Sequence, residues 1–94
     1  MTPTARSLAK LRAEGWTAGV VEQRVPIPGN ARVTRDYLGC IDIIAVHPQR
    51  GILGVQATSG ANVAARVKKA LAEPRLLPWL AAGARFQVWG WAKQ

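Results

Sequence analysis

Acidic residues, cysteine and histidine are scarce in this 94-residue sequence. Five aspartates and glutamates stand against thirteen lysines and arginines, which gives a formal net charge of +8. The single cysteine, Cys40, excludes an internal disulfide, and together with the single histidine, His47, it is too few for a zinc site built from these residue types. We expect Cys40 to be a small core residue and His47 to be a solvated residue of a turn.

Long apolar runs are also missing. No stretch approaches the roughly 20 apolar residues that cross a bilayer. The basic residues 1–6 lack the apolar stretch of a secretory signal. We therefore expect a cytoplasmic protein without a membrane partner.

Basic residues are in excess in a composition that is otherwise typical of a globular protein. Hydrophobic residues make up 49% and charged residues 19% of the sequence, as in folded domains, and the length suits a single domain over residues 1–94. A surface with this net charge attracts polyanions. We expect the partner to be nucleic acid, most readily DNA.

Apolar periodicity predicts three helices and four strands. The helices are expected over residues 7–14, 61–73 and 76–82, and the strands over residues 16–25, 37–46, 52–58 and 85–91. The second and third strands are apolar at almost every position, flank a turn and should pair as a hairpin buried on both faces. Both faces then need cover, which predicts an α/β domain with a mixed four-stranded sheet flanked by helices.

Polar side chains interrupt the two most apolar strands. Asp42 lies in the second strand, and Gln56 and Thr58 share one face of the third. Hairpin pairing could bring Asp42 beside them. An aspartate is costly to bury unless its charge is offset, and Mg²⁺ typically takes one or two carboxylates. We therefore expect Asp42 and Gln56 to hold Mg²⁺ or Mn²⁺.

The segments that carry these residues, GCIDIIA over 39–45 and GILGVQAT over 51–58, resemble the PD-(D/E)XK nuclease superfamily. Its small members include archaeal Holliday-junction resolvases and virus-type replication-repair nuclease domains. The resemblance covers almost the whole chain in element order and implies a restriction-endonuclease-like α-β-β-β-α-β core. It also implies a metal-dependent endonuclease that hydrolyses DNA phosphodiester bonds, and a homodimer.

In that superfamily an aspartate and a later Glu-x-Lys hold the metal and position the attacking water. By resemblance Asp42 stands for the aspartate, Gln56 for the glutamate and Thr58 for the lysine. Glutamine still offers an oxygen to a hard metal but contributes no charge. Threonine cannot stabilise charge on the phosphate, so Lys69 or Arg66 of the predicted helix 61–73 is expected to take that role.

A second carboxylate is expected from Glu22 on the first strand, with Glu14 on the first helix as the alternative. The residues expected to contact nucleic acid share a positive charge and lie on the helix 61–73 or in the basic loop before the second strand. They are Arg32, Arg35, Arg66, Lys68 and Lys69.

Structural alternatives accompany each assignment. Asp42 could pair with Arg24 or Arg35, and Gln56 and Thr58 could hydrogen-bond across the sheet. The basic helix face could be solvated only.

Two further functions stay open at this point. One is a catalytically degenerate nuclease fold that acts as a nucleic-acid-binding or assembly module. The other is a structural homodimer joined through tryptophans. Trp89 and Trp91 fit a core or a dimer interface better than a platform for stacking bases, and Trp79 would join them in a dimer interface.

Overall fold

The computed structural model describes residues 1–25 and 33–92. Its elements follow in the order α1 (Pro3–Ala13), β1 (Thr17–Val20), β2 (Gln23–Val25), β3 (Val33–Arg35), β4 (Ile43–His47), β5 (Gly51–Ser59), η1 (Gly60–Asn62), α2 (Val63–Leu71), α3 (Leu76–Ala81) and β6 (Arg85–Trp91). Strands β1, β4, β5 and β6 form one sheet in that spatial order. The β1–β4 and β4–β5 pairs are antiparallel and β5–β6 is parallel. The α/β fold with a mixed four-stranded sheet flanked by helices is therefore confirmed.

The hairpin expected from the two apolar strands is the centre of this sheet. Ile43 lies opposite Val55 and His47 opposite Gly51, so the turn falls where the sequence indicates it. After β5 the chain crosses over through η1, α2 and α3 before β6 pairs in parallel with β5, because a parallel neighbour requires a connection longer than a hairpin turn.

Two predicted strands are wrong in their extent. The strand expected over 16–25 is divided, because its second half leaves the sheet as β2 and pairs with β3 in a separate two-stranded sheet. The strand expected over 37–46 begins only at Ile43. Leu38 and Gly39 have φ angles of 54° and 74°, which form a left-handed turn, and an extended strand cannot run through such a turn. Tyr37 forms an isolated antiparallel bridge with Ile41.

The first helix begins four residues earlier than expected, at Pro3. The hydroxyl of Thr2 accepts a hydrogen bond from the N–H of Ala5 at 3.1 Å. A proline suits the first turn because an N–H at that position would have no partner within the helix. The helix expected over 61–73 is shorter than predicted, and Ala70 is its buried residue. The apolar residues of this helix cover the sheet only in part, since Val67 is 39% and Leu71 is 82% exposed.

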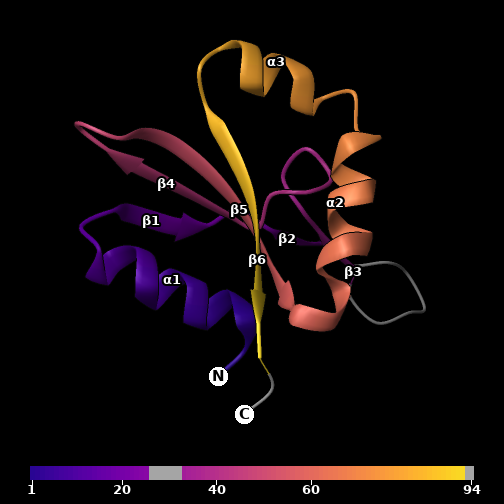
Figure 1. Cartoon of the computed structure of the whole chain (residues 1–94), viewed down its shortest axis with the longest axis horizontal. Coiled ribbons are helices and arrows are strands. Elements are labelled where there is room, and N and C mark those ends of the chain that lie inside the picture. Colours follow the sequence, from indigo (N-terminus) through magenta and orange to yellow (C-terminus); the bar gives the residue numbers. More distant parts are fainter. Residues whose placement is uncertain (26–32, 93–94) are drawn as a thin grey trace.

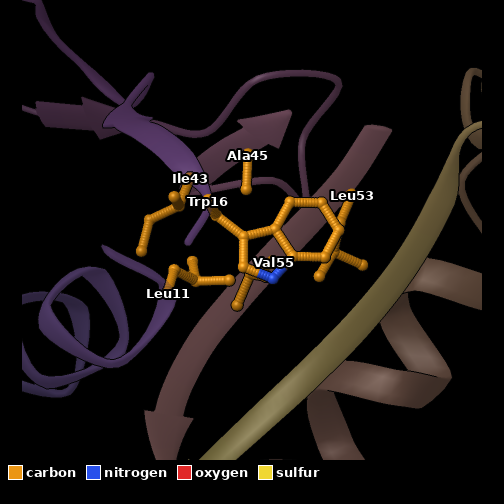
Figure 2. Packing of buried hydrophobic residues seen from close by; sticks show 6 residues of the cluster. All are labelled: Leu11, Trp16, Ile43, Ala45, Leu53 and Val55. Atoms are coloured by element: carbon orange, nitrogen blue, oxygen red, sulfur yellow. The ribbon is translucent and has the colours of Figure 1, made fainter. Parts of the chain in front are cut away.

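Each face of the sheet has its own core, as Figure 1 indicates by the positions of α1 and α2 on opposite sides. Figure 2 shows the core on the α1 side, formed by Leu11, Trp16, Ile43, Ala45, Leu53 and Val55. The core on the other side consists of Cys40, Ile41, Ala70 and Leu76. Cys40 is therefore a core residue, as expected, and burial raises the pKa of its thiol. Among the described residues no helix is long and apolar enough to cross a membrane.

The tryptophans are part of the fold. Trp89 packs against the core on the α1 side, and Trp79 packs against the other and donates a hydrogen bond to the carbonyl of Arg85. Trp91 donates to the hydroxyl of Ser7 at 2.8 Å. None of the three is among the exposed large side chains.

Candidate metal centre

Asp42 lies immediately before β4, at the point where the chain enters the sheet. Its backbone N–H donates to the carbonyl of Val55 at 2.9 Å, and its carboxylate accepts from the N–H of Ala57 at the same distance. The residue is only 5% exposed. Side chains alternate between the two faces along β5, and Val55 lies in the α1-side core. Gln56 therefore faces the other side of the sheet, where it lines one pocket together with Asp42.

A third residue, Asp36, belongs to this site and was not predicted from the sequence. It follows β3 directly, and its carboxylate accepts a hydrogen bond of 3.1 Å from the side-chain amide of Gln56. Glu22, between β1 and β2, completes the group. Carboxylate oxygens of Glu22, Asp36 and Asp42 lie within 4.8 Å of one another. Of the two expected second carboxylates, Glu22 is therefore the one at the site.

Thr58 and Glu14 lie away from this pocket. Thr58 is buried on β5, opposite Gly90 of the parallel strand, and does not line the pocket. Glu14 is at the end of α1 and forms an ion pair with Lys10 at 2.8 Å. The structure thus provides no geometric support for Thr58 in the role of the superfamily lysine.

Burial and neighbouring acids disfavour charge on Asp42. Burial is the largest cause that raises the pKa of this carboxyl, to about 7, followed by its hydrogen bond with Asp36 and by the negative charges of Asp36 and Glu22. The N–H of Ala57 acts in the opposite direction. At neutral pH the site therefore gains from a cation that offsets its negative charge.

Gln56 contributes an unsatisfied buried oxygen to this pocket. It is 2% exposed, and although its amide nitrogen donates to Asp36, its oxygen Oε1 is buried with no hydrogen-bond partner. Buried polar atoms are rarely left unsatisfied in native proteins. A hydrated cation would satisfy this oxygen, either by direct coordination or through the protons of its water molecules.

The lining of the pocket also includes two cations. The pocket has a volume of about 410 Å³ and is lined by Thr4, Glu22, Asp36, Asp42, Gln56, Ala57, Arg66 and Lys69. Within the described part of the chain the ion pairs are Lys10–Glu14 and Arg75–Glu73, so Arg66 and Lys69 are not neutralised by an acid there. Both extend from α2 and are available to an anion held beside the carboxylates.

Two of the remaining predicted nucleic-acid contacts, Lys68 and Arg35, do not line the pocket. Lys68 is exposed on α2, and Arg35 is exposed at the end of β3 and forms no ion pair with Asp42. The side chain of Arg24 and the whole of Arg32 lie outside the described residues. Pairing of Asp42 with Arg35 is therefore excluded.

The donor set fits a hard divalent cation. Three carboxylates and one amide oxygen are the oxygen ligands that Mg²⁺ and Mn²⁺ favour, and a coordinating carboxylate must be deprotonated, which a cation would promote at Asp42. No protein-family model matches the sequence, and neither a curated protein nor a solved structure matches it.

Proposed function

We propose that the pocket is the centre of a metal-dependent endonuclease that hydrolyses DNA phosphodiester bonds. The observation that carries this proposal is the set of three carboxylates within 4.8 Å, in one pocket with a buried amide oxygen without a partner and with two cations without ion pairs. A buried carboxylate with a purely structural role is typically paired with a lysine or an arginine. These three acids have no such partner among the described residues.

Each residue of the pocket has a distinct role in this proposal. Asp36, Asp42 and Glu22 hold Mg²⁺ or Mn²⁺, with Gln56 adjacent as a neutral oxygen donor. When bound, such a cation polarises a phosphoryl oxygen and lowers the pKa of its water. Lys69, with Arg66, binds the phosphate and takes the place that Thr58 cannot fill. In this proposal the scissile phosphate would contact both the bound cation and these two side chains.

DNA is the proposed substrate because of the charge of the whole chain. The net charge of +8 favours a polyanion over a small substrate, and such contacts bind the backbone without reading sequence. The proposal does not include a preferred DNA structure.

A nucleic-acid-binding or assembly module without catalysis is the second candidate. One observation favours it: position 58, where the resemblance implies a lysine, has a buried threonine outside the pocket. The two functions differ in whether Mn²⁺ leads to cleavage.

The test uses supercoiled plasmid, branched DNA and single-stranded DNA with Mg²⁺ or Mn²⁺ at pH 8. We expect metal-dependent cleavage by the wild type, none by Asp42→Asn, and wild-type cleavage by the control Glu14→Gln, which changes a carboxylate outside the pocket. Calorimetric heat with Mn²⁺ but salt-sensitive DNA binding without cleavage would support the module. Absence of any Mn²⁺ binding by the wild type would exclude the endonuclease.

The homodimer stays a prediction that light scattering at several protein concentrations tests. Trp79, Trp89 and Trp91 do not support it, because their indoles pack or hydrogen-bond within the chain.

A further inference from the structure

The side-chain amide of Gln56 has two ends in unequal surroundings. Its nitrogen donates to the carboxylate of Asp36 at 3.1 Å, whereas its oxygen has no donor. Because Gln56 is 2% exposed and extends from the central strand β5, it is held by the packing of the sheet. Its nitrogen is therefore a fixed donor beside the carboxylate cluster.

Asp36, in contrast to Gln56, does not extend from the main sheet. It follows β3, which pairs only with β2 in the small second sheet and not with the main sheet. Asp42 is oriented by the N–H of Ala57. The Asp36 carboxylate is linked to the main sheet by the amide of Gln56 and by protonated Asp42, and of these two hydrogen bonds the one from Gln56 remains when Asp42 is ionised. A glutamate at position 56 could not make this bond, because an ionised carboxylate only accepts.

We propose that Gln56 positions Asp36 through its amide nitrogen, and that the second carboxylate of the metal centre comes from position 36 and not from position 56. This inference rests on the proposed metal site and assigns the roles within it. Gln56 is then the donor that holds the Asp36 carboxylate in place, and it does not substitute for a metal-binding glutamate. Loss of a residue that orients a metal ligand typically costs about 10- to 100-fold in metal affinity.

The first measurement is calorimetric Mn²⁺ titration of Gln56→Met, which has similar size but no donor. We expect its affinity to fall by about tenfold or more. The matched control is Thr58→Val, since Thr58 is a buried polar residue on the same face of β5 but outside the pocket, and its affinity should equal that of the wild type. Thermal unfolding checks that both variants fold.

The second measurement separates positioning from direct coordination. Infrared difference spectra with and without Mn²⁺ report the carboxylate bands, and Gln56 has no carboxylate. A change of these bands in Gln56→Met must therefore arise at another residue, and we expect the contribution of Asp36 to be lost. Where Asp36→Asn retains measurable binding, adding Gln56→Met should lower the affinity by less than it does in the wild type, because the carboxylate that Gln56 positions is already absent.

The outcomes distinguish the two proposals. If Asp42→Asn and Asp36→Asn bind Mn²⁺ as the wild type does, the metal site itself is refuted. If both lose binding while Gln56→Met keeps wild-type affinity or wild-type carboxylate bands, the metal site stands and the positioning role of Gln56 is refuted. Fully multiplied losses in the double variant would also refute it, because they would leave Gln56 only the role of an independent ligand.

Discussion

Replacement of Asp42 by asparagine should stabilise the metal-free protein at neutral and alkaline pH. Asparagine can accept from the N–H of Ala57 as the carboxylate does, and its own amide can donate to Asp36 as the protonated carboxyl does. It has no charge to bury. The substitution thus fixes the side chain in a form that resembles protonated Asp42.

The size of the effect follows from the pKa of Asp42, which the fold raises from an ordinary 3.8 to about 7. Below the lower value both folded and unfolded chains bind the proton, and no penalty exists. As the pH rises through this window the unfolded chain loses its proton first, so the wild type loses about 1.4 kcal/mol of stability per pH unit, up to roughly 4 kcal/mol above pH 7. Asp42→Asn avoids this loss.

The assay is urea unfolding of wild type and Asp42→Asn with EDTA at pH 4, 5.5 and 8. The difference in the free energy of unfolding should grow with pH in favour of the variant, because the variant has no buried carboxyl at position 42 to ionise. Saturating Mn²⁺ at pH 8 should then stabilise only the wild type, by about 2.7 kcal/mol at a hundredfold excess over the dissociation constant. A difference that does not depend on pH, or a variant less stable at pH 8, would refute the argument.

Two other predictions concern the two cations that line the pocket and the close contact of Gly90 with Val63 and Gly60. Arg66→Ala and Lys69→Ala should each weaken DNA binding on all sequences and reduce the slope of log affinity against log salt by about one, measured by fluorescence anisotropy, whereas an unchanged slope would remove that residue from the phosphate contacts. Gly90→Ala should destabilise the fold by about 1–3 kcal/mol in urea unfolding, because the added methyl carbon would lie 2.3 Å from a methyl group of Val63 and 3.1 Å from the backbone of Gly60. Unaltered stability would mean that η1 and α2 shift freely away from β6.

The sheet could be predicted from the sequence because apolar pattern determines it locally. The run around Ile43 and the run around Val55 are continuous and β-branched, and both became central strands with covered faces. The ends of the strands could not be predicted so well. The left-handed turn at Leu38 shortens one strand, and its only signal in the sequence is Gly39.

The candidate site could be predicted only where it belongs to the sheet. Asp42 and Gln56 interrupt apolar runs, so the pattern identifies both. Asp36 stands next to charged Arg35 in a segment without periodicity, and nothing local distinguishes it from a solvated acid. Its place beside Gln56 depends on how the small β2–β3 sheet packs against the main one, which is a long-range property.

The distribution of the five acids is the reason that we propose a bound cation in this pocket and not a purely structural role. The two acids outside the pocket, Glu14 and Glu73, each form an ion pair with a nearby cation. The other three gather in one pocket, where the described residues provide no ion pair to any of them although the chain has thirteen lysines and arginines. A structural cluster would be stabilised by a direct arginine partner, and the two arginine or lysine side chains that line the pocket do not form one. In our proposal this arrangement costs stability in the metal-free protein, and a cation among the carboxylates together with an anion on Arg66 and Lys69 would offset that cost.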